Sequence, residues 1–367
     1  MNGEPPGGNP LHRLWAVLED QVRGQLKEAA RRVPPLRRIM EDLQRLRSPV
    51  AQLELERAAL GSQGAVLSRQ CKDLREEVEQ LKRGEHGDTK QFVPPGHFYS
   101  PIPPLTWVRD NDARIFGASG RELPGIDLQE TRQMELVEKF QGYYDELSFP
   151  VSKSPGHRYF FENHSYSYSD GFFLHSMIRH VRPKRIIEVG SGYSSSMMLD
   201  TNERFFDGAI DLTFVEPYPD LLKSLMRPDD EGRVKIIAQG VQGVDPALFQ
   251  ALQAGDILFI DSTHVSRVGS DVNYLFFEVL PRLAPGVYVH IHDIFYPFEY
   301  PREWIYEGRS WNEAYLLRCL LSHTSAWEIV LFNTFVEQFH RKHFEQHLPL
   351  CLKNAGGSIW LRRRELL

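Results

Sequence analysis

Residues 185–195 read RIIEVGSGYSS, and this stretch decides the fold that we expect. Its first five residues form a short apolar run flanked by charge, which is typical of a buried strand. Gly190 and Gly192 then allow a tight turn and a close approach of the backbone to a ligand. The hydroxyl-rich residues after the turn open a helix whose first N–H groups can bind a carboxylate or a phosphate. A strand, a glycine turn and a helix in this order predict one unit of a parallel α/β sheet.

The same alternation of apolar runs and helical stretches continues along the chain. Because strands that alternate with helices form parallel sheets with right-handed crossovers, we predict an α/β fold with a Rossmann-like, doubly wound sheet. The sheet is expected to have seven strands, mostly parallel, and to follow an N-terminal helical and coiled-coil extension. The other strands are expected at 212–215, 234–237, 256–260, 287–291, 327–332 and 358–361, and helices at 127–147, 171–180, 194–201, 221–226 and 312–321.

A leucine recurs at every seventh position from Leu53 to Leu81, and Ser48-Pro49 before this run suits the start of a helix. A leucine stripe at this spacing is buried only against another helix. We therefore predict a coiled coil over 48–85 that joins protomers into a homodimer or a higher oligomer. Packing of this helix against the body of its own protein is the alternative.

The other segments differ from one another in composition. Residues 1–47 are expected to form an N-terminal amphipathic helix region, and residues 151–367 form the domain that carries the sheet. Between the coiled coil and that domain, 86–150 is a proline-rich, aromatic connecting segment and helix, which we expect to serve as a lid or an interface. Its repeated prolines exclude helix and central strand over 92–107.

The bulk composition narrows the class of protein. Of the 367 residues, 41% are hydrophobic and 25% are charged, which is ordinary for a folded protein with a sizeable core. The net charge of −6 gives no electrostatic reason to expect nucleic-acid binding. Three widely spaced cysteines argue against a disulfide framework and a cysteine zinc site. Because the chain lacks a signal-peptide pattern and a long apolar run, we expect a cytoplasmic protein without a membrane span.

Chemistry is expected just after the strands, because ligands of such sheets bind beyond the carboxyl ends of the strands. Glu216 ends the second strand, where a carboxylate can accept hydrogen bonds from both hydroxyls of a ribose. A solvated carboxylate at a strand end is the alternative for this residue. Asp261 ends the fourth strand with His264 three residues later, and His292-Asp293 ends the fifth. Since the fourth and fifth strands are expected to be neighbours, these side chains should converge.

Several stretches together resemble the motif series of class I S-adenosylmethionine-dependent methyltransferases. They are EVGSGYSS at 188–195, FVEPY at 214–218, ILFIDSTH at 257–264 and VHIHDI at 289–294. Within that class the chain resembles the methyltransferase family 24 group, and it is also similar to cephalosporin hydroxylase-like proteins and macrolide-sugar O-methyltransferases. The resemblance covers roughly residues 165–300. It implies a methyltransferase that uses S-adenosylmethionine to methylate a hydroxyl of a small-molecule or glycan acceptor.

The resemblance also implies roles for individual residues. Asp261 would lie beside the sulfonium and the acceptor, and Glu216 would bind the ribose, with Pro217 next to it. Residues 166–171, including Tyr168, would close over the cofactor. The methionine moiety and sugar would be held by Glu188 and the turn residues Gly190, Ser191 and Gly192, followed by Tyr193 and Ser194, and the adenine would be flanked by Gly240 and Val241, next to Gln242.

Two hypotheses for the acceptor side remain open. In one, Asp261, His292 and Asp293 bind a divalent cation, either Mg²⁺ or a transition metal, which lowers the pKa of the acceptor hydroxyl. The relatives usually carry a carboxylate or amide beside the fifth-strand aspartate, and the histidine here suits Mn²⁺, Fe²⁺ or Zn²⁺ better than Mg²⁺. In the other, no metal binds, and His264 or His292 is the general base, oriented by Asp261 or Asp293.

The stretch after the fifth strand is rich in aromatic residues, and it includes Trp304, Arg309 and Trp311. It is expected either to wall an acceptor pocket, where a sugar ring would fit, or to cover the edge of the sheet. Two other functions compete with methyl transfer. One is metal-dependent hydroxylation on the same fold, and the other is a non-catalytic scaffold that recruits partners through the coiled coil.

Overall fold

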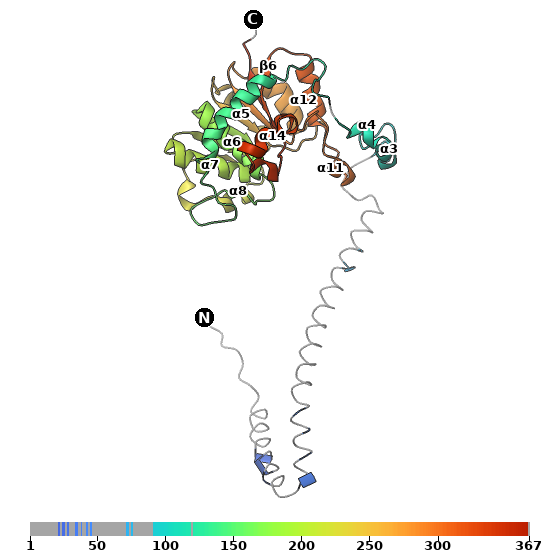
Figure 1. Cartoon of the computed structure of the whole chain (residues 1–367), viewed down its shortest axis with the longest axis vertical. Coiled ribbons are helices and arrows are strands. Elements are labelled where there is room, and N and C mark those ends of the chain that lie inside the picture. The colour runs from blue at the N-terminus through green and yellow to red at the C-terminus, as the bar shows by residue number, and fades with distance from the viewer. Residues whose placement is uncertain are drawn as a thin grey trace. The chain divides into compact units, whose positions relative to one another are not determined.

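The computed structural model of the chain describes residues 91–118 and 120–365, together with a few isolated residues between 21 and 75 (Figure 1). The chain divides into two compact units, 1–92 and 93–367. The predicted amphipathic region at 1–47 and coiled coil at 48–85 lie almost wholly outside the described residues, so both stay predictions.

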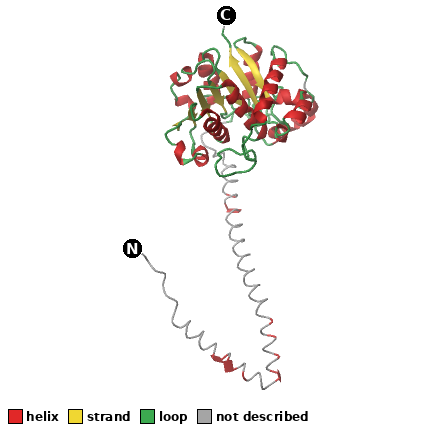
Figure 2. Ribbon diagram, turned by 60° about the vertical axis from the view of Figure 1, so that its left-hand side comes forward, coloured by secondary structure: helices red, strands yellow, loops and turns green. Residues whose placement is uncertain are grey.

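The second unit is built on a seven-stranded sheet with the order β3-β2-β1-β4-β5-β7-β6. The first five strands are parallel, and β7 runs antiparallel to both of its neighbours. Helices lie on both faces of the sheet (Figure 2). The predicted fold class is therefore confirmed. The strands are β1 (Arg185–Val189), β2 (Asp211–Val215), β3 (Lys235–Ile237), β4 (Ile257–Ile260), β5 (Tyr288–His292), β6 (Trp327–Phe332) and β7 (Ser358–Arg363).

The central strands are apolar along their length because helices cover both of their faces. All four residues of β4 are completely buried. The core continues into the helices, where α5, α6 and α7 pack against one another. The helices around the sheet are α5 (Glu130–Tyr144), α6 (Tyr168–Val181), α7 (Tyr193–Phe206), α8 (Asp220–Leu225), α9 (Ala247–Gln250), α10 (Asp271–Tyr274), α11 (Arg302–Tyr306), α12 (Glu313–Ser322), α13 (Asn333–Phe339) and α14 (Arg341–His347).

Two local expectations were wrong. Helix α6 begins at Tyr168, three residues before the expected start, and Tyr168 is itself buried. Residues 168–171 are therefore part of a packed helix, which leaves only 166 and 167 outside it. Helix α3 (Leu105–Asp110) also begins within the stretch where prolines were expected to exclude helix. It starts directly after Pro104, because proline fixes φ near its helical value and its missing N–H costs nothing before the first turn.

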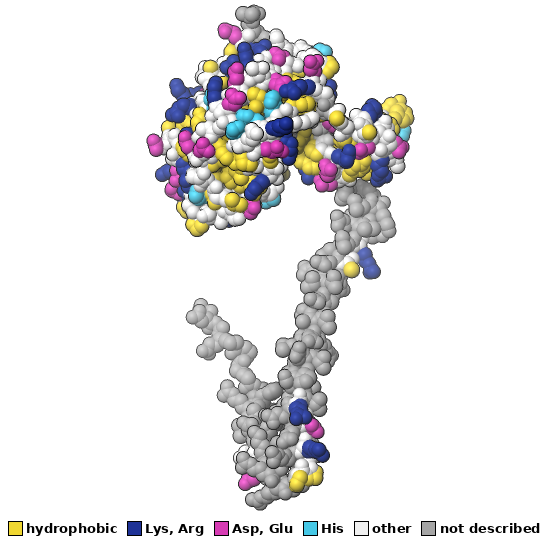
Figure 3. Space-filling model, in the orientation of Figure 1, with side chains coloured by type: hydrophobic (Ala, Val, Ile, Leu, Met, Phe, Trp, Pro, Cys, Tyr) yellow, Lys and Arg dark blue, Asp and Glu magenta, His cyan; other side chains and the backbone are white. Residues whose placement is uncertain are grey.

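The connecting segment is tied to the loop that follows β5. Arg302 pairs with Asp112 of α4 (Asp112–Ile115) at 2.8 Å, and the Tyr296 hydroxyl donates to the backbone oxygen of Gly120 at 2.5 Å. The surface of this segment is rich in hydrophobic side chains (Figure 3), among them Phe98 and Trp107. Within the described residues, no helix is long and apolar enough to cross a membrane.

Candidate active site

A cavity of about 600 Å³ opens beyond the carboxyl ends of β1, β2 and β4. Gly190 lines this cavity and has φ of +82°, a backbone conformation that favours glycine. A Cβ on Gly190 would lie 1.7 Å from the backbone oxygen of Asp261, so only glycine lets the β1 turn approach the end of β4. Of the predicted cofactor residues, the cavity is lined by Gly190, Glu216, Pro217, Gly240, Val241 and Asp261, and also by Gln242.

Glu216 lies at the rim of this cavity with its carboxylate already oriented. The backbone N–H of Ser191 donates to one carboxylate oxygen at 3.1 Å, and that of Tyr218 donates to the other at 2.8 Å. Each oxygen keeps a further lone pair, so the carboxylate can still accept hydrogen bonds from a ligand. A nucleoside with two neighbouring ribose hydroxyls fits this arrangement. Gly240 and Val241, which the resemblance assigns to the adenine, also line the cavity.

The remaining predicted cofactor residues lie around the cavity or beneath it. Glu188 is completely buried and accepts hydrogen bonds from the hydroxyls of Ser194 and Ser195, both at 2.5 Å. Burial raises the pKa of the Glu188 carboxyl to about 8. Tyr168 donates instead to Glu162 at 3.2 Å. The cavity lining does not include Ser191 and Gly192 of the β1 turn, or Tyr193, which follows the turn. The assignment to the cofactor stays a prediction both for these residues and for those that line the cavity.

Four side chains from the ends of β4 and β5 converge beside the cofactor cavity. His264 Nε2 lies 3.3 Å from Asp261 Oδ1 and 3.5 Å from Asp293 Oδ2, and His292 Nε2 lies 3.6 Å from Asp293 Oδ1. Within the described part of the chain, the group suited to a metal ion is Asp261, His264 and Asp293, whose ligand atoms all lie within 4.8 Å of one another. The histidine of this group is therefore His264, whereas the sequence prediction had named His292 together with the two aspartates.

A fifth residue of the cluster, Glu313, was missed by the sequence analysis. It is completely buried at the start of α12, and its Oε2 lies 2.9 Å from His264 Nδ1. Trp311 also contacts this histidine, with ring centroids 4.4 Å apart. An acidic residue in the first turn of a helix is usually explained by the helix dipole. The sequence therefore held no signal that Glu313 reaches a histidine far away in the chain.

The electrostatics of the cluster favour a positive charge between the carboxylates. Burial alone would lower the pKa of His264, but hydrogen bonds with Asp261 and Glu313 hold it well above its ordinary value. Burial also opposes ionisation of Asp261, yet the charges of His292 and His264 keep the pKa of this carboxyl below its ordinary value. For Asp293 burial prevails, and its pKa is raised. The carboxylates around His264 therefore favour the protonated form of its ring.

A deeper layer of polar groups lies behind the cluster. Asp170 in α6 is buried and accepts a hydrogen bond from the backbone N–H of Gly357 at 3.1 Å. Burial raises the pKa of this carboxyl to about 6. The ring of Tyr166 lies 5.0 Å from that of His292, and its buried hydroxyl has no hydrogen-bond partner among the described residues. A buried carboxyl, that of Asp170, and a buried phenol, that of Tyr166, therefore lie in the core near the cluster.

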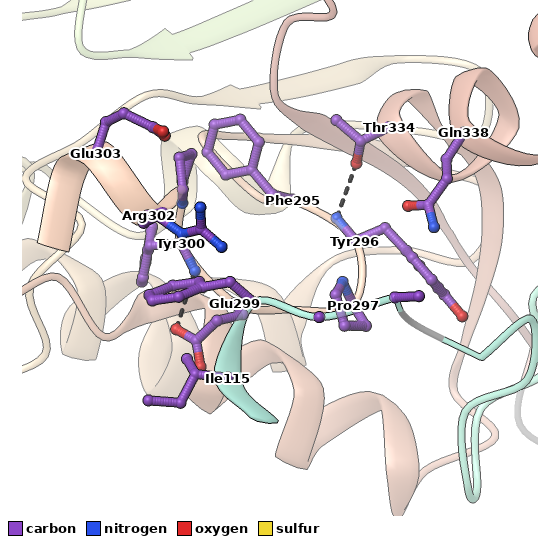
Figure 4. Close-up of a pocket in the computed structure, with 14 residues that line it drawn as sticks. Ile115, Phe295, Tyr296, Pro297, Glu299, Tyr300, Arg302, Glu303, Thr334 and Gln338 are labelled. Carbon is purple, nitrogen blue, oxygen red and sulfur yellow. Dashed lines mark hydrogen bonds between the residues drawn. The ribbon is translucent and has the colours of Figure 1, made fainter. Parts of the chain in front are cut away.

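A second cavity, of about 540 Å³, lies between α4 and the loop that follows β5 (Figure 4). In the view of Figure 4, Phe295 and Glu303 lie across it from Glu299 and Ile115, and Thr334 and Gln338 lie at one end. A row of aromatic rings joins this cavity to the acidic cluster. Successive ring centroids are 5.1 Å apart from Phe295 to Trp304, 5.2 Å from Trp304 to Trp311 and 4.4 Å from Trp311 to His264.

Comparisons with known proteins agree with this geometry. A family model described as a methyltransferase domain matches residues 187–294, which include the β1 turn, Glu216 and the cluster. An uncharacterised protein of Archaeoglobus fulgidus is 35% identical over 182 residues, which make up 47% of this chain and 80% of that protein. This identity and coverage make the two proteins members of one family.

Solved structures offer a weaker likeness. An S-adenosylhomocysteine-bound methyltransferase of Podospora anserina is 14% identical, with 76% of this chain and 100% of that chain covered and a TM-score of 0.37. An O-methyltransferase of Streptomyces achromogenes in complex with S-adenosylmethionine is 16% identical, with 63% and 90% covered and a TM-score of 0.35. At these TM-scores neither structure supports an inference about this chain. The family model and the strand order together place the chain among the class I S-adenosylmethionine-dependent methyltransferases, in the family 24 group, with S-adenosylmethionine as its cofactor.

Proposed function

We propose that this methyltransferase methylates an oxygen of a small hydroxylated acceptor, with a divalent cation bound by Asp261, His264 and Asp293. The observation that carries the proposal is the convergence of three ligand atoms within 4.8 Å of one another. Asp261 also lines the cofactor cavity, so the cation site adjoins the methyl donor. A metal ion at this position would lower the pKa of an acceptor hydroxyl and orient it toward the methyl group.

The proton affinity of His264 favours a metal over a histidine base. A general base must be unprotonated at the working pH, and its ideal pKa lies near that pH. With Asp261 and Glu313 beside it, His264 has a pKa well above its ordinary value and would be protonated near neutral pH in the absence of a metal. A protonated imidazole cannot accept the hydroxyl proton. Two carboxylates and one imidazole form a mixed oxygen and nitrogen set, which suits Mn²⁺, Fe²⁺ or Zn²⁺ at least as well as Mg²⁺.

The second cavity supports a carbohydrate as the acceptor. Its lining alternates aromatic rings, such as Phe295 and Tyr300, with hydrogen-bonding groups such as Glu303 and Gln338. A sugar ring has both apolar C–H faces and many hydroxyls, so it can satisfy both kinds of lining. A purely apolar ligand would bury these polar groups without partners, which costs about 1–3 kcal/mol for each group. The lining carries two carboxylates, those of Glu299 and Glu303, and one guanidinium, that of Arg302, so its charged groups do not favour a strongly anionic ligand.

Isothermal titration of the metal-free protein tests the cation site. We expect Mn²⁺ to bind the wild type and to bind an Asp293→Asn variant at least about tenfold more weakly, because a charged ligand is lost. The exposed Glu278→Gln variant is the control and should bind Mn²⁺ like the wild type.

Methyl transfer to a panel of methyl glycosides, followed as S-adenosylhomocysteine release, should stop in EDTA. Transfer that continues in EDTA would refute the metal and leave a histidine base.

A further inference from the structure

We propose that Glu313 is a positioning residue that fixes the tautomer and the ring orientation of His264, so that Nε2 is presented to the cation. The inference rests on the proposed function, since it concerns the same site. It adds an outer layer to the site from α12, an element outside residues 187–294 that the family model matches. Glu313 touches neither cofactor nor acceptor in this account and acts only through the histidine.

The contact between the two side chains decides which nitrogen carries the hydrogen. Burial raises the pKa of the Glu313 carboxyl, and the contact with His264 opposes this rise. In its ionised form the carboxylate can only accept hydrogen bonds, so at 2.9 Å from Glu313 Oε2 the Nδ1 atom of His264 is then the donor. In the neutral ring the lone pair is then on Nε2. That lone pair faces Asp261 Oδ1 at 3.3 Å and Asp293 Oδ2 at 3.5 Å. Three electron-rich atoms that face one another repel unless a cation lies among them.

The start of α12 holds His264 at several further points. The backbone N–H groups of Asn312 and Glu313 both donate to the backbone oxygen of His264, at 3.1 Å and 3.2 Å. The side-chain oxygen of Asn312 accepts from the backbone N–H of Ser266 at 2.6 Å. His264 itself adopts φ of +59°, an unfavourable conformation for a residue with a side chain. Strain of this kind persists only where the surroundings over-determine it, as they do here.

The same arrangement bears on which cation is preferred. A carboxylate that accepts the second ring hydrogen of a metal-bound histidine orients the ring and raises its basicity, and loss of such a partner typically costs about 10–100-fold in metal affinity. A better nitrogen donor strengthens binding of transition metals more than binding of Mg²⁺, which prefers oxygen. Glu313 should therefore increase the preference of the site for Mn²⁺ or Zn²⁺ over Mg²⁺.

The test compares the full-length wild type with Glu313→Gln, Glu313→Ala and the control Glu337→Gln, which neutralises another buried glutamate. Long-range ¹⁵N NMR of the histidine rings, with His264 assigned by a His264→Gln spectrum, reports the tautomer at a pH where the ring is neutral. We expect hydrogen on Nδ1 in the wild type and the control. A glutamine amide can either donate or accept, so Glu313→Gln should show a mixture of tautomers.

Titration with Mn²⁺ and with S-adenosylmethionine completes the test. Both Glu313 variants should bind Mn²⁺ about 10–100-fold more weakly, with cofactor affinity and the control unchanged. The proposal is overturned if Glu313→Gln keeps a single tautomer with hydrogen on Nδ1, or keeps wild-type Mn²⁺ affinity. If the wild type itself binds no Mn²⁺, the cation of the proposed function fails, while the tautomer of the neutral ring still decides the role of Glu313.

Discussion

At the scale of single residues, Glu188 shows how a buried carboxyl can serve the β1 turn. It has no cationic partner among the residues that the structure describes, and two serine hydroxyls of α7 are its donors. Burial raises its pKa to about 8, from an ordinary value near 4.5. The hydroxyl of Ser195 in turn accepts from the backbone N–H of Gly192 at 3.0 Å, so the carboxyl fixes the turn through the helix. The β1 turn thus depends on the Glu188 carboxyl, whose ionisation costs free energy because the group is buried.

This raised pKa predicts a pH-dependent stability. The folded state binds the Glu188 proton more tightly than the unfolded state, so the contribution to stability is complete below about pH 4.5 and is lost as the pH rises through about 8. Glu188→Gln cannot ionise. We expect the free energy of unfolding of the wild type to fall relative to this variant between about pH 5 and about pH 8, measured by urea denaturation without cofactor.

The exposed Glu345→Gln variant is the control, and its difference from the wild type should not vary over this pH range. A difference between Glu188→Gln and the wild type that stays constant with pH would contradict the raised pKa.

At the scale of elements, a buried ion-pair network joins the loop before α6 to α7. Arg158 is buried and pairs with Asp200 of α7 at 2.7 Å and with Asp230 at 2.5 Å. Asp200 also accepts from the backbone N–H groups of Arg158 and Tyr159, at 2.8 Å and 2.9 Å. The hydroxyl of Tyr159 then donates to the backbone oxygen of Tyr166, next to the site. The network therefore holds the segment that leads to α6 against the sheet.

Removal of Asp200 should be costly, because the buried Arg158 loses one of its carboxylate partners and two backbone N–H groups lose their acceptor. We expect Asp200→Ala to lower the free energy of unfolding by about 3–5 kcal/mol. Asp229→Asn is the control, since Asp229 is exposed and its pair with Arg233 spans 4.0 Å. It should change the stability by less than about 0.5 kcal/mol. Chemical denaturation of both variants at the same pH measures the two effects, and equal effects would show that the network contributes little.

At the scale of the whole molecule, the connecting segment and the domain form one compact unit, 93–367. Asp112 and Gly120 of this segment contact the loop that carries Arg302 and Tyr296, and Ile115 to Ala118 line the second cavity. The wall of the second cavity is thus built partly from residues before the domain. If the coiled coil predicted for 48–85 forms, it would join this chain to a second protomer.

The oligomer is tested by changing the leucine stripe. If Leu67 and Leu74 lie in a coiled-coil seam, the double variant Leu67→Lys and Leu74→Lys should dissociate the protein into monomers, since each lysine would bury a charge. Sedimentation velocity should then report the mass of one chain, against at least two chains for the wild type. The control is Ser62→Lys with Glu76→Lys, two positions that the predicted heptad pattern assigns to the outer face of the same helix, and it should remain associated. Monomers in the wild type would refute the coiled coil.

The sequence by itself determined the strands, their parallel arrangement and the residues at their carboxyl ends. It could do so because a buried strand followed by a glycine turn is a local pattern, and because a sheet brings the carboxyl ends of its parallel strands to one edge. Gly190, Glu216, Asp261 and Asp293 follow directly from that pattern. Prolines and helix starts were harder to interpret, as the beginnings of α3 and α6 show, because local signals leave a helix start uncertain by a few residues.

Only the tertiary structure decided which histidine lies between the two aspartates and what holds it there. His264 and Glu313 are 49 residues apart in the chain. Their contact depends on the packing of α12 against the end of β4, which no local spacing encodes. The second cavity depends in the same way on α4 and the loop after β5, which are almost two hundred residues apart in the chain. Periodicity and strand ends are properties of neighbouring residues, whereas a site with several layers is a property of the packed chain.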